Sequence, residues 1–306
     1  MSPDSPIIVI DSGLGGLTVV RSLRKVLPGE DILYFGDTAR LPYGSKTAAT
    51  VTGFVQQIIA YLRQYDAKHV VIACNTATAL SLPAVRAAFP GLSISGVIEP
   101  GAKAATAAAG AKQVPTIAVL ATEATIRSKA YERAIHRRRC HTRMLLRPAP
   151  LLVPLIEEGR EPADPLVKLA LQQYLDPMLK HHMDVLVLGC THYPVYKQLI
   201  CKIVGNGVRV IDSAEQCADD VARRLKTRKL LNDARPADGA DDDPPGQEKA
   251  QRIGELRCFV TDDPARFQRL APRFLGVEIE KPTWVAPDEL YGPSTTGGPV
   301  RLSVPA

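Results

Sequence analysis

Short apolar runs alternate with longer amphipathic segments along most of this chain, and this alternation limits the folds open to it. The runs are IIVID (7–11), DILYFGD (31–37), HVVIAC (69–74), SISGVI (93–98), TIAVLAT (116–122), DVLVLGC (184–190) and RVIDS (209–213). Runs this short and this rich in β-branched residues are typical of buried strands. Between them, segment 47–65 spaces its apolar residues three and four apart, which predicts a helix. The sequence therefore predicts an α/β fold with parallel strands and right-handed crossovers.

Two of the predicted strands end in the same way. VVIACNTA (70–77) and LVLGCTHY (186–193) each place a cysteine at the carboxyl end of a buried strand, followed by residues suited to a helix N-cap. The cysteines, Cys74 and Cys190, are 116 residues apart (190 − 74), which is about the length of one domain. The pattern predicts two similar α/β units, each presenting one cysteine.

Such a pair of thiols suits one kind of chemistry. To invert a carbon centre, a base must remove a proton on one face while an acid supplies one on the other. A free thiol has a pKa of about 8.5, and helix N-termini or nearby cations lower it, so thiol and thiolate are both accessible near neutral pH. Ligands of open α/β sheets also bind at the carboxyl ends of strands. Taken singly, each cysteine is better explained as an inert core residue, because structural cysteines far outnumber catalytic ones. The polar neighbours favour a ligand site instead: Asn75, Thr76, Thr191 and His192.

Two loops add polar groups to the predicted site. DSGLGG (11–16) is a glycine-rich turn before a helix beginning near Leu17, and free amides there favour an anionic group such as a carboxylate. Asp11 suits a substrate ammonium group or a thiol, although helix capping is the alternative explanation for Asp11 and Ser12. The pattern is not GxGxxG, so a dinucleotide site is poorly supported. In GDTARLPYGSK (36–46), the Pro42-Tyr43-Gly44 turn can face a ligand carboxylate.

Composition narrows the setting. The six cysteines form no CxxC pair, so we expect reduced thiols and no metal site. No apolar run approaches the roughly 20 residues that cross a bilayer, and no signal-peptide pattern opens the chain, so we expect a cytoplasmic location and no membrane partner. Segment 231–254, rich in Asp, Pro, Gly and Ala, is expected to be a mobile acidic insertion, and 291–306 a disordered tail.

Six motifs in a fixed order identify a family resemblance. They are DSGLGGLTV, YFGDTARLPYG, ACNTATA, the Thr122 and Thr125 pair in ATEATIRS, LVPLIEEG and LGCTHYP. In this order, from about residue 7 to 213, they make the chain similar to the bacterial glutamate racemases of the aspartate/glutamate racemase superfamily. The resemblance implies interconversion of L- and D-glutamate, with D-glutamate supplied for peptidoglycan, and neither pyridoxal phosphate nor a metal. We also expect a homodimer.

The resemblance also implies roles for individual residues. Cys74 would exchange the proton of the D-enantiomer and Cys190 that of the L-enantiomer, with Asp11 and His192 assisting the respective thiols. Acidic residues with supporting roles would be Asp37 and Glu157. The residues implied to bind glutamate are Ser12, Pro42, Tyr43, Gly44, Asn75, Thr76, Thr122, Thr125 and Thr191.

The family fold is implied as well. It consists of two pseudo-symmetric, open parallel-sheet (flavodoxin-like) α/β domains with the active site between them. Here the first domain would comprise 1–98 and 207–290, and the second 99–206.

Two alternatives stay open. An aspartate racemase or a related amino-acid racemase of the superfamily would use the same thiols, but the residue after Cys-Thr is typically acidic in aspartate racemases, and here it is His192. The other alternative is a basic binding or regulatory protein. The formal net charge is +6, and RAIHRRRCHTR (133–143) could contact nucleic acid, or gyrase as reported for racemase relatives, although a solvated helix end explains it more simply.

Overall fold

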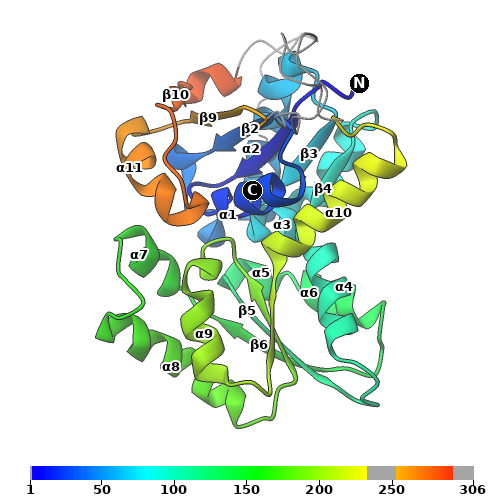
Figure 1. The fold of residues 1–306 in the computed structure, drawn as a ribbon, viewed down its shortest axis with the longest axis vertical. Coiled ribbons are helices and arrows are strands. Elements are labelled where there is room, and N and C mark those ends of the chain that lie inside the picture. The colour runs from blue at the N-terminus through cyan, green and yellow to red at the C-terminus, as the bar shows by residue number, and fades with distance from the viewer. Residues whose placement is uncertain (1, 233–252, 292–306) are drawn as a thin grey trace, which may run out of the picture.

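The computed structural model describes residues 2–232 and 253–291, which form two parallel β-sheets covered by helices (Figure 1). The first sheet contains β1 (Ile7–Asp11), β2 (Ile32–Gly36), β3 (His69–Ile72), β4 (Ile94–Gly96), β9 (Leu256–Val260) and β10 (Thr283–Trp284), in the order β10-β9-β2-β1-β3-β4. The second contains β5 (Thr116–Ala121), β6 (Arg143–Pro148), β7 (Val185–Gly189) and β8 (Arg209–Asp212), in the order β6-β5-β7-β8. The predicted α/β fold with parallel strands is therefore confirmed.

The two sheets repeat one topology. The order β2-β1-β3-β4 in the first sheet matches β6-β5-β7-β8 in the second when each strand is paired with the strand four places later in the chain. Strands β3 and β7 are therefore equivalent, and they are the strands that precede Cys74 and Cys190. The repeat that the sequence predicts from the two strand ends is present in the sheet order.

Helices α1 to α11 connect and cover the strands. Their bounds are α1 (Leu17–Val26), α2 (Ala48–Leu62), α3 (Asn75–Ala88), α4 (Ile98–Ala108), α5 (Glu123–Arg127), α6 (Ala130–His136), α7 (Leu152–Glu157), α8 (Pro165–Leu179), α9 (Lys197–Val204), α10 (Ser213–Thr227) and α11 (Pro264–Leu275). The helix expected over 47–65 is α2, which starts where the Thr47 side chain accepts a hydrogen bond from Thr50 N. It gives way to a 3-10 turn over Arg63–Tyr65 and stops at Asp66, whose φ of 45° is left-handed.

The first sheet is buried on both faces, as parallel sheets generally are. Successive side chains of a strand point to opposite faces, so Ile7 and Val9 join one hydrophobic cluster while Ile8 and Ile10 join another. Full burial of one such side chain stabilises the fold by roughly 1.5–3 kcal/mol. This two-sided packing holds the strands in place, and with them the positions of the polar residues that follow their carboxyl ends.

The chain crosses between the domains twice. It leaves the first domain through α4, which packs against α6, and it returns through α10, which packs against α1 (Figure 1). Strand β8 pairs with β7 through Arg209 opposite Val185 and Asp212 opposite Leu188, so it belongs to the second sheet. The return expected at residue 207 therefore comes later, at the start of α10.

The segment expected to be an acidic insertion leaves and rejoins the fold at one turn. Asn232 N donates to Glu30 Oε1 at 2.9 Å, and Gly254 N donates to Pro28 O at 2.8 Å. Between these anchors, residues 233–252 lie outside the described part of the chain, as do 292–306 at the expected tail. The predictions of mobility and disorder for these segments thus remain predictions.

In the ranges 2–232 and 253–291, none of the helices has the length and the apolar character that crossing a membrane requires.

Candidate active site

The two cysteines occupy equivalent strand ends where the domains meet. Cys74 is the N-cap of α3 and its Sγ accepts a hydrogen bond from Ala77 N at 3.4 Å, while Cys190 directly follows β7. Both are buried, with exposed fractions of 7% and 6%. Negative charge on Cys190 is one of the influences that raise the pKa of Cys74, after burial and Asp11.

Cys74 has an environment that keeps it protonated. Burial raises its pKa to about 12, the charge of Asp11 adds to the rise, and hydrogen bonds from Ala77 and Ser12 only partly oppose it. The net lowering of the thiol pKa that we expect at a helix N-terminus therefore does not occur at Cys74. The amide of α3 does act in that direction, but loss of water around the sulfur has the larger effect.

Asp11 is the last residue of β1 and is fully buried. Its Oδ2 accepts from Gly13 N at 2.9 Å and its Oδ1 from Thr191 Oγ1 at 3.4 Å. Burial raises the pKa of Asp11, while the charge of His192 and these hydrogen bonds lower it. Thr18 Oγ1 in turn donates to Thr191 O at 3.0 Å, so the loop after β1 is joined to the loop after β7.

Cys190 has the opposite environment. His192 Nδ1 lies 3.9 Å from Cys190 Sγ, and its Nε2 lies 2.9 Å from Glu157 Oε1. Burial alone would lower the pKa of His192, but Cys190 and Glu157 outweigh it and raise this pKa to about 10. Burial would raise the pKa of Glu157, and His192 and Arg266 reverse that effect. An imidazolium is thus held beside Cys190.

Asn75 and three threonines line the junction between the domains. Asn75 Oδ1 accepts a hydrogen bond from Tyr131 at 2.8 Å, and Asn75 Nδ2 is buried without a partner. Thr76 Oγ1 of the first domain lies 2.9 Å from Thr122 Oγ1 and 3.3 Å from Thr125 Oγ1 of the second. Asn75 and the three threonines, predicted from two separate motifs, therefore come together in one place.

The Pro42-Tyr43-Gly44 turn is held by a buried carboxylate. Tyr43 donates to Asp37 Oδ2 at 2.5 Å, Thr261 Oγ1 donates to Oδ1 at 3.0 Å, and Arg40 Nε lies 3.0 and 2.8 Å from the two oxygens. Burial and the charge of Asp37 raise the pKa of Tyr43, so its hydroxyl stays protonated. The turn faces the second domain, because a methyl group added at Gly44 would lie 3.6 Å from Thr122 Cβ.

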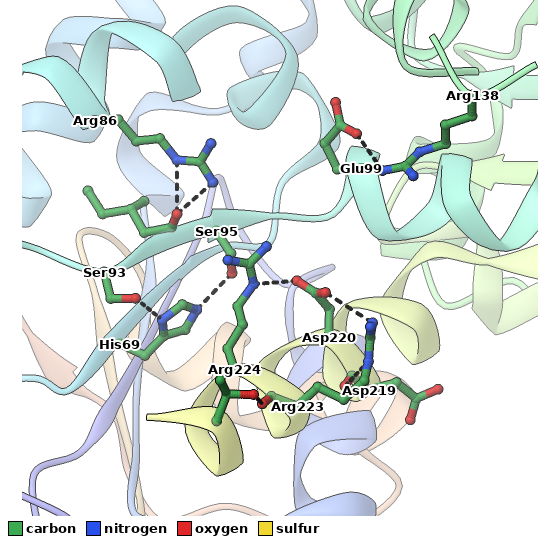
Figure 2. Close-up of polar contacts among 12 residues, drawn as sticks. His69, Arg86, Ser93, Ser95, Glu99, Arg138, Asp219, Asp220, Arg223 and Arg224 are labelled. Atoms are coloured by element: carbon green, nitrogen blue, oxygen red, sulfur yellow. Dashed lines mark hydrogen bonds and ion pairs between the residues drawn. The ribbon is translucent and has the colours of Figure 1, made fainter. Parts of the chain in front are cut away.

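The basic segment 133–143 makes contacts within the protein. Arg137 and Arg138 both pair with Glu99 of α4, the latter at 3.1 Å, and Arg139 donates to the carbonyl oxygens of Gly110 and Lys112 (Figure 2 shows Glu99 beside Arg138). These arginines therefore fasten α6 and the turn after it to α4. The contacts favour the simpler explanation of the cluster as a helix end.

Known proteins share this sequence and this architecture. Residues 7–221 match the family model described as Asp/Glu/Hydantoin racemase. The chain is 43% identical over 271 residues to the glutamate racemase of Syntrophus aciditrophicus, covering 89% of this chain and 93% of that protein. The crystal structure of the Francisella tularensis glutamate racemase in complex with D-glutamate superposes with a TM-score of 0.80 at 34% identity, covering 93% of this chain and 98% of that one. The crystal structure of the Thermus thermophilus glutamate racemase superposes with a TM-score of 0.77 at 38% sequence identity, and the match covers 94% of this chain and 100% of that one.

This chain belongs to the Asp/Glu/hydantoin racemase family. It is an isomerase, an amino-acid racemase, as its relatives are. The two-domain architecture of these relatives accounts for the paired sheets.

A second set of contacts closes the racemase on the side of Cys190. Arg273 of α11, in the first domain, donates to Gly159 O at 3.2 Å and to Arg160 O, and pairs with Glu161 at 2.5 Å. The neighbouring Phe274 ring stands edge-on to His192, with centroids 5.4 Å apart. Helix α11 of the racemase therefore covers the Glu157–His192 pair.

Sequence reasoning missed these closing residues and Tyr131. Nothing local in the sequence of α11 marks its contacts with the second domain. Tyr131 occupies an apolar position of the amphipathic helix α6, which is the pattern of an ordinary core residue. Its hydroxyl would have been a usable signal, because a buried tyrosine hydroxyl needs a hydrogen-bond partner.

Proposed function

We propose that this racemase interconverts L- and D-glutamate by transferring the α-proton between two thiols, without a cofactor. The observation that carries the proposal is the placement of Cys74 and Cys190 after equivalent strands, both buried at one domain junction, with a group of opposite charge near each. The charge of Asp11 raises the pKa of Cys74, and the His192 imidazolium lies 3.9 Å from Cys190 Sγ.

The reaction then runs as a paired proton transfer. Cys190 as thiolate removes the α-proton of L-glutamate, and the Cys74 thiol delivers its proton to the opposite face of the carbanion, which yields D-glutamate. The protein is left with Cys190 protonated and Cys74 as thiolate, the state that converts D- to L-glutamate. His192 stabilises negative charge on Cys190, and Asp11 raises the proton affinity of Cys74, which assists its return to the thiol.

Substrate recognition follows from the donors at the junction. Several groups at the junction suit the two carboxylates of glutamate. They are the free Nδ2 of Asn75, the amides of the Pro42–Gly44 turn, and the hydroxyls of Thr76, Thr122, Thr125, Thr191 and Ser12. Asp37 supports the site by accepting a hydrogen bond from Tyr43, and Glu157 supports it by pairing with His192. Glutamate is favoured over aspartate because His192 follows Cys190-Thr191 and because relatives at 42–43% identity are named glutamate racemases.

The role in peptidoglycan synthesis, the cytoplasmic location and the homodimer belong to the same proposal.

Solvent exchange tests the proposal directly. Purified protein, treated with chelator and freed of pyridoxal phosphate, is incubated with L-glutamate in D2O. We expect D-glutamate in chiral chromatography, and loss of the α-proton signal in NMR, with L-aspartate unchanged as the control. A requirement for pyridoxal phosphate, or preferential turnover of aspartate, would overturn it.

The imidazolium of His192 predicts a pH-dependent stability. Its pKa is about 10 in the folded protein against an ordinary value of 6.5, so its contribution is complete below pH 6.5 and is lost as pH rises through about 10. We expect the difference in unfolding free energy between wild type and His192→Gln to shrink over this range, measured by urea denaturation. A difference that is constant or grows with pH would contradict the charge assignment.

A further inference from the structure

Tyr131 contacts the candidate substrate site from the other domain, and its contact determines what Asn75 can do. We propose that Tyr131 is a positioning residue, which orients the side-chain amide of Asn75 so that its N–H group faces the substrate. The inference rests on the proposed function, because Asn75 is one of the residues assigned there to glutamate.

The hydrogen bond between them fixes the direction of the amide. Tyr131 OH donates to Asn75 Oδ1 at 2.8 Å, and both side chains are 2% exposed. An amide has an accepting end and a donating end, so a donor placed at Oδ1 leaves Nδ2 turned the other way. This Nδ2 is buried and has no partner. A buried, unpaired donor is costly unless a ligand satisfies it, and a carboxylate would do so.

Tyr131 is itself held firmly enough to impose this orientation. Its ring packs against two glycines: a methyl group added at Gly189 would lie 3.1 Å from the ring, and one added at Gly101 would lie 3.4 Å from the hydroxyl. The hydroxyl also interacts with Ser213, the first residue of α10. Gly101 and Ser213 belong to the two helices by which the chain crosses between the domains, and Gly189 directly precedes Cys190. The tyrosine therefore sits at a fixed point of the domain junction.

The contact also joins substrate binding to domain arrangement. Asn75 begins α3 of the first domain, whereas Tyr131 lies in α6 of the second, and the two helices approach each other at the junction (Figure 1). The amide of Asn75 is thus oriented only while the two domains stand in this arrangement. The same domain arrangement that places Cys74 and Cys190 at the site therefore also turns the Nδ2 of Asn75 toward a substrate carboxylate.

A double-mutant cycle tests the inference. Tyr131→Phe keeps the ring and its packing but removes the hydroxyl, so we expect kcat/KM for glutamate to fall about 10- to 100-fold in both directions. Asn75→Ala removes the donor itself and should lower kcat/KM at least as much. If Tyr131 acts through Asn75, the double variant should match Asn75→Ala alone within about twofold, because the two effects are not additive.

The controls separate position from mere stability. Tyr174, on α8, is another buried tyrosine, and its hydroxyl accepts a hydrogen bond from Leu151 N at 3.3 Å. Tyr174→Phe removes this hydroxyl and should leave kcat/KM unchanged. Melting temperatures show whether each variant is folded at the assay temperature. Independent, multiplicative losses in the double variant, or a Tyr131→Phe enzyme with wild-type kcat/KM, would overturn the inference. A wild-type protein that does not racemise glutamate would instead overturn the proposed function.

Discussion

Replacing either Cys74 or Cys190 by serine is expected to lower racemisation of glutamate by at least about 10³-fold, in line with the usual contribution of a positioned acid or base. A hydroxyl is a far weaker acid than a thiol and cannot replace it as a proton carrier. The fold should persist, because a hydroxyl at position 74 can still accept from Ala77 N. Steady-state rates from both enantiomers measure the effect.

Each single variant should also keep one half of the reaction. With Cys74→Ser, Cys190 can still remove the α-proton of L-glutamate and return a deuteron to the same face, so slow exchange without inversion is expected in D2O. With Cys190→Ser, the same behaviour is expected for D-glutamate. Cys217→Ser is the matched control, since Cys217 is fully buried on α10 and should be dispensable. Two single variants that both racemise at wild-type rates would refute the two-thiol mechanism.

Gly15→Ala is expected to lower kcat/KM at least about 100-fold, because displacing reacting groups by an ångström can cost that much. A methyl group at this position would lie 2.3 Å from Thr191 Oγ1 and 2.4 Å from His192 Nδ1. Both side chains belong to the second domain, where Glu157 holds His192, and Asp11 of the first domain accepts a hydrogen bond from Thr191. The clash would therefore be relieved by separating the domains at the site.

A thermal melt distinguishes this effect from unfolding. Gly15→Ala should stay within a few degrees of the wild-type melting temperature, since each domain keeps its own core. Gly53→Ala is the matched control: nothing lies within 4 Å of the added methyl, and the helix α2 should gain about 0.5–1 kcal/mol with activity unchanged. A Gly15→Ala protein with wild-type kcat/KM would show that the loops do not need this close approach.

Most of the fold follows from local pattern. The strands were predictable because two-sided burial produces continuous apolar runs, such as IIVID at β1. Which sheet a strand joins is a different matter, because it depends on pairing between distant segments. Strand β8 shows this: RVIDS carries no mark of pairing with β7 rather than with the first sheet.

The candidate site divides in the same way. Cys74 and Cys190 stand out in the sequence because polar residues follow a buried strand, which is a local anomaly. The rise in the pKa of Cys74 was not predictable, since it comes from burial and from Asp11, a residue far away in the chain. Tyr131 and Arg273 were missed for a related reason, because their partners lie in the other domain.

The repeated sheet order has a consequence for the energetics of turnover. A two-fold rotation exchanges the two sides of a planar carbanion, so duplicated halves are a natural scaffold for handling mirror-image molecules. The halves differ in what surrounds each sulfur, Asp11 in one and His192 in the other. L- and D-glutamate have equal free energies in water, so their equilibrium constant is 1 and the kcat/KM values of the two directions must be equal. If kcat differs between the two directions by some factor, KM must therefore differ by the same factor.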